Sequence, residues 1–510
     1  MLFLFENAAA IAVAAVVSLM GWLFGGTRGD VLLVVVPWVL LFLVEIMICF
    51  PQRYSYETTY EARERVWSDI RSDPLVWLAI GFGVLMLVPF VNKGLCPQCD
   101  YASIAAGVDA SPPIKFLPFC VDRLSHLNTV MWFATAFVTA ITAKHALLKS
   151  GKRLALSLIV WNGVLLAIFG FVQHGMGAPG PLWQEANALA PKWRATLFFS
   201  TFGYCNMAGS YFVLLFGLAV ALWRDCCEKY HEIRLAKEKD GDASENRHMF
   251  WRKHYYLIPA IIIFYAALNT LSRAAIILAV VTATVYFFHT FVSFLSRRSK
   301  ARRAWAAFWS MLAFGLIVLF SLNYAPDDIR REMDSLDTEE VLNRTTGKGV
   351  YQSSVAYEIW KDNFLFGCGG WGYKHLSVPK LLPRIRKGER LGGPGQGNVH
   401  NDYLQFLVEH GTVGFGMIVA FVVLLLVPVF KTWNWLIKGQ RFKKKKDQPP
   451  APIQIFALPA SAFCILTANT AVLIHAFGDC PLRSLAVLSL FFVSLSTITG
   501  FLPERNNSRN

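Results

Sequence analysis

The stretch Leu154–Val172 reads LALSLIVWNGVLLAIFGFV and holds no charged side chain. Val31–Phe50 and Ala274–Leu295 are apolar blocks of similar length. About 18–20 apolar residues cross a bilayer as a helix. Because these blocks lack the polar face that a surface helix of a soluble protein would show, they predict membrane-spanning helices.

The composition supports a membrane class. Of the 510 residues, 55% are hydrophobic and only 16% are charged, whereas a soluble chain carries about 25% charged residues. Ala8–Phe24 lacks a basic segment before it, so we expect a first span and not a cleaved signal peptide. We predict an all-α polytopic membrane protein with about twelve spans. Their expected ranges are 8–25, 31–50, 75–92, 127–147, 154–173, 197–223, 255–272, 274–295, 305–323, 403–430, 454–475 and 483–502.

The net charge of +15 is distributed in alternate loops. Lys and Arg gather in the connections 51–74, 148–153, 224–254, 296–304 and 431–453, and almost none occur in 26–30 or 476–482. This alternation follows the positive-inside rule and places both termini in the cytoplasm. Anionic headgroups of membrane lipids therefore account for the charge, and no nucleic-acid partner is expected.

The longest connection divides the chain by topology. We expect residues 1–323 to hold the first nine spans, 324–402 to form an outer loop, and 403–510 to hold the last three spans and a cytoplasmic tail. The loop would face the periplasm of a Gram-negative host. Loops of this length are usually functional, and Val350–Asp362 within it is predicted to be helical.

Three cysteines lie in the predicted outer connection 93–126, namely Cys96, Cys99 and Cys120. Disulfides persist on this side of the membrane, and we favour a structural disulfide here. Free or metal-bound thiols stay open, because Cys96 and Cys99 have redox or metal spacing. A membrane redox or signalling protein built on these two residues is accordingly one functional class to test.

The most distinctive stretch is Phe366–Tyr373, FGCGGWGY, followed by Asn398–Gln405, NVHNDYLQ. It continues through Glu409–Gly414, EHGTVG, into a span. His400 thereby stands where a helix enters the outer leaflet, and an imidazole there can take a proton from a sugar hydroxyl near neutral pH. The alternative is a histidine that caps or packs the helix. The glycines allow a tight turn or a close approach to a bulky substrate.

Arg273 interrupts about forty apolar residues between two predicted spans on the outer side, where a guanidinium is costly unless paired or functional. It either grips an anionic substrate or extends to lipid headgroups. A basic spacer follows the glycine-rich stretch, and it forms either a rim around an anionic donor or a solvated face. Its members are Lys374, Lys380, Arg384, Arg386, Lys387 and Arg390.

These segments, in this order, resemble the O-antigen ligase and polymerase family. That family shows a glycine-rich segment, a variable loop, an HND-type motif and a Glu-x-Gly-x-x-Gly tail. Upstream, Thr201–Gly209 with Arg194 before it, and Asn269–Ala274, are similar to two further family segments; His475–Leu482 is similar to a third. The chain departs from the pattern at Cys205, where Pro is usual, at Ala274, where Gly is usual, and at Cys480, where Phe is usual.

The resemblance implies a glycosyltransferase of the C type at the outer face of the bacterial inner membrane. The donor would be a glycan on polyprenyl (undecaprenyl) diphosphate, and the acceptor lipid A-core, another lipid-linked glycan or a protein hydroxyl. Ligase is favoured slightly over polymerase. Direct attack with inversion is expected, with no cofactor or metal, since the outer loops lack an Asp-x-Asp pair.

Implied catalytic residues are His400, as general base, with Arg273 and Arg194 on the diphosphate. Implied substrate-binding residues are Asn206, Asn398, Asn401, Asp402, Gly367, Gly369, Arg384, Arg386 and His475. The rival class is a transporter or lipid-linked-glycan flippase. Such a protein would be expected to show charges or broken helices near the midplane, often in related halves. The polar residues here gather at one face, which favours an interfacial enzyme.

Overall fold

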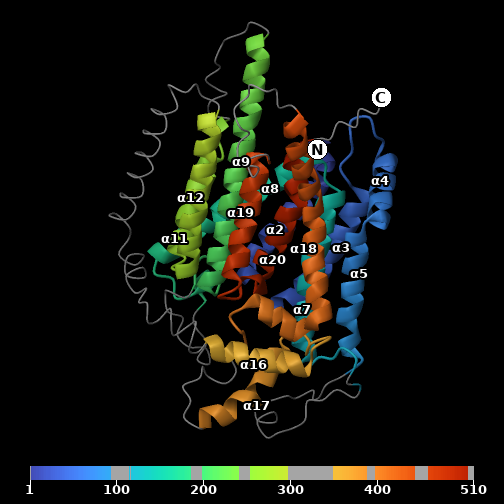
Figure 1. Ribbon diagram of the computed structural model, residues 1–510, viewed down its shortest axis with the longest axis vertical. Coiled ribbons are helices and arrows are strands. Elements are labelled where there is room, and N and C mark those ends of the chain that lie inside the picture. The colour runs from blue at the N-terminus through green and yellow to red at the C-terminus, as the bar shows by residue number, and fades with distance from the viewer. Residues whose placement is uncertain are drawn as a thin grey trace. The chain divides into compact units, whose positions relative to one another are not determined.

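The computed structural model describes residues 2–92, 114, 116–184, 198–239, 253–296, 349–386, 397–442 and 458–503. Over these residues the regular elements are helices, and no β-strand occurs among them (Figure 1). The longer helices are α2 (Ala8–Trp22), α3 (Gly29–Cys49), α4 (Thr59–Ser72), α5 (Pro74–Leu87), α7 (Arg123–His145), α8 (Lys149–Gly175), α9 (Cys205–Lys239), α11 (Leu257–Asn269), α12 (Arg273–Ser296), α16 (Gly349–Asp362), α17 (Gly372–Arg386), α18 (Asp402–Phe442), α19 (Ala460–His475) and α20 (Leu485–Thr497). Short helical turns are α1 (Leu2–Glu6), η1 (Phe24–Gly26), η2 (Val88–Phe90), η3 (Pro181–Trp183), η6 (Pro481–Arg483) and η7 (Ile498–Phe501).

Apolar helices account for the predicted spans. Six helices are long and apolar enough to cross a membrane, α4 and α5 form a pair bent by 64°, and α2, α11, α19 and α20 are shorter apolar helices. Each predicted span coincides with one of these helices except 305–323, which lies outside the described residues. The prediction of an all-α polytopic membrane protein is confirmed, and the count of twelve spans stays a prediction.

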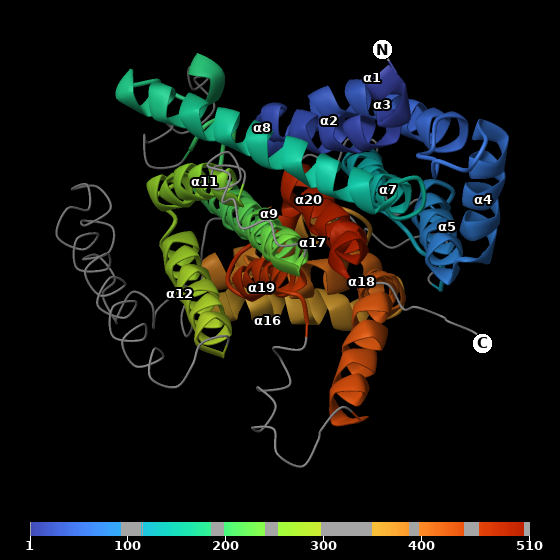
Figure 2. The same cartoon turned by 90° about the horizontal axis from the view of Figure 1, so that it is seen from above.

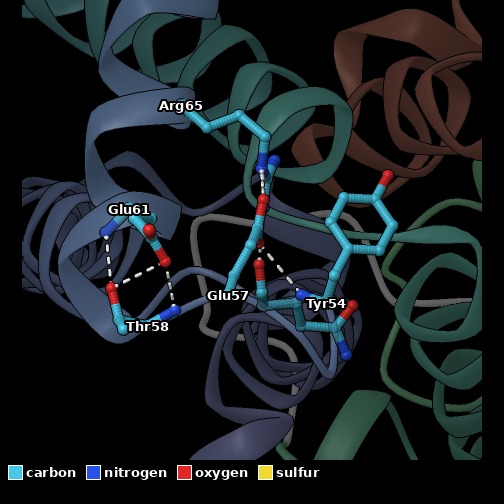
Figure 3. A network of polar contacts seen from close by, with 6 residues as sticks. Tyr54, Glu57, Thr58, Glu61 and Arg65 are labelled. Carbon is cyan, nitrogen blue, oxygen red and sulfur yellow. Dashed lines mark hydrogen bonds and ion pairs between the residues drawn. The ribbon is translucent and has the colours of Figure 1, made fainter.

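Helix α4 occupies most of the connection 51–74, for which the charge pattern predicts a basic loop. A reciprocal cap starts it: Glu61 N donates to Thr58 Oγ1 over 3.2 Å, and Thr58 N donates to Glu61 Oε2 over 2.7 Å (Figure 3). Arg65 Nε donates to Glu57 Oε1 over 3.0 Å. Caps of this kind satisfy amide groups that a helix start leaves open. The charged residues are therefore the polar face of a helix whose buried face is Ala62, Val66 and Ile70.

The chain forms two compact units whose segments alternate along the sequence. The first unit comprises 1–151, 336–425 and 472–496, and the second comprises 152–335, 426–471 and 497–510. The three-part division at 323 and 402 is a division by membrane topology, and it stays a prediction.

In the first unit, α7 packs against α2, α3, α4 and α5, and α16 packs against α17. Figure 1 shows α16 lying crosswise to the upright α5. One buried apolar cluster joins α16 and α17 to the segments around them. Its members are Phe119, Val121, Val355, Ala356, Ile359, Cys368, Tyr373, Leu381, Val399 and Val408. This core fixes the glycine-rich stretch against the start of α18.

Helix ends that the charge pattern assigns to the outer side meet at one face of the first unit. Ser484 Oγ donates to Gly25 O over 2.6 Å, which joins the start of α20 to the end of α2. Asp402 N donates to Ala476 O over 2.9 Å, which joins the start of α18 to the end of α19.

Ends assigned to the cytoplasm meet each other in the same way. Leu148 N donates to Gln52 Oε1 over 2.9 Å, and His145 Nε2 lies 2.8 Å from Asp73 Oδ2. Both contacts join the connection 51–74 to the region around 148–153. This grouping agrees with the alternation of basic loops, and the side of the membrane that each group faces stays a prediction.

In the second unit, α9 packs against α11 and α12 (Figure 2). Small residues make the packing of α9 close: a Cβ added at Gly209 would lie 2.3 Å from the Cβ of Ala275 in α12, and one at Gly217 would lie 2.3 Å from that of Ala468 in α19. Helices in membranes associate through such small residues, because lipid supplies no hydrophobic drive between them.

Candidate active site

His400 and Asp479 form the centre of the candidate site. His400 precedes α18 in the left-handed conformation, with φ 55°. Its Nδ1 lies 3.1 Å from Asp479 Oδ1, and the two side chains are 41% and 7% exposed. Asp479 follows α19, and its backbone N donates to His475 O over 3.0 Å. The pair thus joins an accessible imidazole to a buried carboxyl group.

The proton positions of this pair follow from the charge of Asp479. Burial disfavours the ionised form, but the hydrogen bond and charge of His400, the charge of His475 and the backbone N–H of Cys480 outweigh it, which lowers the pKa of Asp479 to about 2. An ionised carboxylate accepts hydrogen bonds and donates none. His400 Nδ1 therefore carries the hydrogen, and in the neutral ring Nε2 is left as the proton acceptor.

The HND motif holds His400 in place through its neighbours. Asn401 Oδ1 accepts the backbone N–H of Leu404 over 3.0 Å, an N-cap for α18. Asp402 is fully buried, and its Oδ2 accepts the N–H of Leu482 over 2.8 Å. Asp402 N also donates to Ala476 O. Asp402, at the start of α18, is therefore hydrogen-bonded to the chain both before and after Asp479.

Three residues of the predicted site therefore have internal contacts or burial. Asn401 caps a helix, Asp402 is buried, and His475 is only 4% exposed. Asn398 lies half-buried, with an Oδ1 that has no hydrogen-bond partner among the described residues. The structure brings all four to the His400–Asp479 pair, and substrate contact by any of them stays a prediction.

A buried network of polar side chains holds the backbone next to His400 in place. Glu409 Oε2 accepts from Arg483 Nη1 over 2.6 Å, and Glu409 Oε1 accepts from Gln405 Nε2 over 2.5 Å. Gln405 Oε1 in turn accepts the N–H of Val399, next to His400, over 2.6 Å. The Arg483 guanidinium lies over the Trp371 ring, 4.0 Å from its centroid. This network ties η6, the first turns of α18 and the residue before His400 into one rigid assembly.

The glycine-rich stretch is docked backbone to backbone on α18. Cys368 N donates to Val408 O over 3.1 Å, and Gly369 N donates to Glu409 O over 2.9 Å. Gly367 and Gly411 have φ of 72° and 66°, and a Cβ at Gly367 would lie 2.5 Å from Gly411 N. Only glycine fits at these two positions, because the backbones of the glycine-rich stretch and α18 approach each other closely there. Gly411 is also the point at which α18 departs from helical geometry. Substrate binding by Gly367 and Gly369 stays a prediction.

The remaining predicted residues are distributed elsewhere. Arg273 begins α12 and Asn206 belongs to α9, both in the second unit, and Asn206 Nδ2 donates to Tyr204 Oη over 2.9 Å. Arg194 lies outside the described residues, as do the side chains of Arg384 and Arg386, whose backbone ends α17. Their roles stay predictions.

The predicted disulfide also falls largely outside the described residues, since Cys96 and Cys99 belong to the undescribed part. Cys120 is a free, buried thiol whose Sγ lies 3.4 Å from Pro89 O. Burial raises its pKa to about 11, so this thiol is protonated at neutral pH.

Sequence reasoning named His400 but missed Asp479, Gln405, Glu409 and Arg483 as parts of the site. The signal for the last two was present, because a charge in an apolar segment requires a partner. Asp479 was part of the segment His475–Leu482 quoted for the family resemblance, without a role.

The fold and the site define a polytopic α-helical membrane protein with a polar site at one face. Residues 258–419 match the family model described as O-antigen ligase. This match supports membership of the O-antigen ligase family and, with it, a glycan ligase or polymerase type of activity. The match includes the segments around Arg273 and His400 and ends before Asp479 and Arg483. A comparison with curated proteins gives no match.

Proposed function

We propose that this protein is an inner-membrane glycosyltransferase of the O-antigen ligase type. It transfers a glycan from polyprenyl diphosphate to an acceptor hydroxyl at the periplasmic face. Family membership and the membrane fold support the general activity. The observation that carries the proposal is the pairing of the exposed His400 ring with the buried Asp479 carboxylate over 3.1 Å.

In this mechanism the acceptor hydroxyl gives its proton to His400 Nε2 while its oxygen attacks the anomeric carbon. The bond from that carbon to the diphosphate oxygen breaks, and the electron pair leaves with the diphosphate. A direct displacement inverts the anomeric centre. Asp479 stabilises the imidazolium as it forms, in the way that a buried carboxylate orients and supports a histidine base. General base catalysis of this kind contributes about 10²–10⁴-fold.

The leaving diphosphate requires positive charge, and Arg273 and Arg194 are proposed to supply it. A guanidinium binds phosphate oxygens in a bidentate manner, so the proposed reaction needs no metal ion. The basic spacer is the other candidate. Part of its charge is already neutralised, since Lys380 Nζ lies 2.9 Å from Asp362 Oδ2. This favours the arginines outside the spacer as the diphosphate ligands.

The test is transfer by the purified protein in proteoliposomes that contain a lipid-linked donor. His400→Ala is expected to reduce transfer by about 10²–10⁴-fold while the variant still inserts in the membrane. His174→Ala, at an exposed histidine near the end of α8, is the matched control and should retain wild-type activity. Full activity of His400→Ala would contradict the proposed base.

The same assay separates ligase from polymerase. One set of vesicles receives lipid A-core as acceptor, and a second receives only the lipid-linked glycan. Transfer to lipid A-core supports the ligase, and chain elongation without it supports the polymerase. Movement of the donor across the bilayer without any new glycosidic bond would instead indicate a flippase.

A further inference from the structure

Three different metal-binding side chains meet at the candidate active site. His400, Asp479 and Cys480 each offer one ligand atom, and these three atoms all lie within 4.8 Å of one another. The nitrogen is 3.1 Å and the sulfur 3.3 Å from the same carboxylate oxygen. Imidazole, carboxylate and thiolate are the three ligand types that zinc uses in proteins.

Two of the three separations between the ligand atoms suit a small tetrahedral ion. Zinc bond lengths of about 2.0–2.3 Å at tetrahedral angles place pairs of ligand atoms about 3.3–3.6 Å apart. The observed 3.1 Å and 3.3 Å differ from this by a few tenths of an ångström. Rotation of exposed His400 can supply that adjustment, because its side chain is 41% exposed whereas Asp479 is 7% exposed.

We propose that His400, Asp479 and Cys480 bind a divalent transition-metal ion of the zinc type, and that the bound ion inhibits glycan transfer. On binding, the Cys480 thiol releases its proton to water, and the His400 hydrogen moves from Nδ1 to Nε2. The ion's two positive charges are balanced by the Cys480 thiolate and the Asp479 carboxylate. A site of zero net charge is favourable where two of the three ligands are buried.

Inhibition rests on the proposed function, in which His400 Nε2 accepts a proton. Metal on Nδ1 places the hydrogen on Nε2, so that atom can no longer act as a base. The bound ion also takes the Asp479 carboxylate as a ligand, so this carboxylate no longer accepts a hydrogen bond from His400. The charge of the ion further disfavours protonation of the imidazole. Three protein ligands leave the fourth position to water, which makes the ion exchangeable.

Cadmium binding tests the site without measuring activity. The purified full-length protein in detergent is titrated with Cd²⁺, and the ultraviolet charge-transfer band from thiolate to cadmium is recorded. Cys480→Ser is expected to lose the equivalent of one cadmium–thiolate bond per chain. Cys464→Ser removes a buried thiol of α19 outside the cluster and should leave the signal unchanged. Because other cysteines also bind Cd²⁺, the difference between the two variants is the measured quantity. Equal signals in these two variants would overturn the site.

Zinc inhibition tests the consequence. Transfer in proteoliposomes is followed against Zn²⁺ concentration, with each protein normalised to its own metal-free rate. The concentration for half-inhibition should rise at least about tenfold in Cys480→Ser, in line with the effect of altering a metal site, and stay unchanged in Cys464→Ser. Equal inhibition of both variants, or activation by Zn²⁺, would overturn the proposed inhibition. The two proposals can fail separately. If His400→Ala retained activity, and Cys480→Ser still bound less Cd²⁺ than Cys464→Ser, the proposed base would be wrong and the metal site would stand.

Discussion

Asp479→Asn isolates the electrostatic part of the proposed mechanism. The substitution preserves the shape of the side chain, and its amide oxygen can still accept the N–H of Cys480, which Asp479 Oδ1 accepts over 2.8 Å. What it removes is the negative charge 3.1 Å from His400 Nδ1. That charge favours the imidazolium that forms when His400 takes the proton from the acceptor hydroxyl.

The size of the effect follows from the distance and the screening. For unit charges 3.1 Å apart the interaction is about 1.3 kcal/mol in water and about 5.4 kcal/mol at an effective dielectric constant of 20. Asp479 is 7% exposed but His400 is 41% exposed, so an intermediate constant of about 40 applies and gives about 2.7 kcal/mol. Because each 1.36 kcal/mol corresponds to a factor of ten in rate, we expect about a 100-fold loss of kcat.

The assay is the initial rate of glycan transfer in proteoliposomes at saturating donor. Asp479→Asn should have no further effect in a His400→Ala background, since both changes remove one function. Asp122→Asn is the matched control: Asp122 lies 3.6 Å from His375 and caps α7, and Asn caps a helix equally well. A rate within threefold of wild type for Asp479→Asn, or the full loss in the His400→Ala background, would refute the reasoning.

Three further predictions concern stability, measured by thermal unfolding of the detergent-solubilised protein. Gly411→Ala should destabilise the folded protein by about 1–3 kcal/mol or more, because a Cβ there would lie 2.3 Å from Leu365 O. Gly416→Ala is the control, since Gly416 has open space around it, and it should leave the stability unchanged. Equal effects of the two substitutions would contradict this account. Glu409→Ala should cost about 3–5 kcal/mol by leaving Arg483 buried without its partner, and an unchanged transition would show that the pair is dispensable. The folded-state pKa of Asp479, about 2, lies below its unfolded value of about 3.9, so its contribution is complete above about pH 5 and is lost as the pH falls toward 2. Asp479→Asn should therefore be less sensitive to acid than wild type over that range, and equal sensitivity would argue against the low pKa.

Local patterns in the sequence were sufficient for most of the fold. Apolar blocks predicted the spans, and the break that Arg273 makes between two of them is the observed boundary between α11 and α12. The predicted helix Val350–Asp362 matches α16. These features depend on neighbouring residues, which a sequence shows directly.

What could not be predicted depends on residues that are far apart. Asp479 is 79 positions from His400, and no local pattern states that the two side chains meet. Helix α17 lies within the basic spacer, where lysines and arginines obscure the apolar residues Val378 and Leu381 that are buried in the fold. The sequence also does not show why residue 411 must be glycine. That requirement follows from the close approach of the Gly411 backbone to the backbone of Leu365, which only the structure reveals.

The ion pair between Glu409 and Arg483 has a consequence for the synthesis and membrane insertion of the protein. The two residues are 74 positions apart, so the carboxylate of α18 reaches the membrane before its guanidinium partner has been synthesised. A lone charge in an apolar setting is disfavoured, and we expect the start of α18 to settle only when η6 arrives. A chain that ends before residue 483 would keep the Glu409 carboxylate without its partner in an apolar setting, so we expect such a truncated chain to fold incompletely at the start of α18.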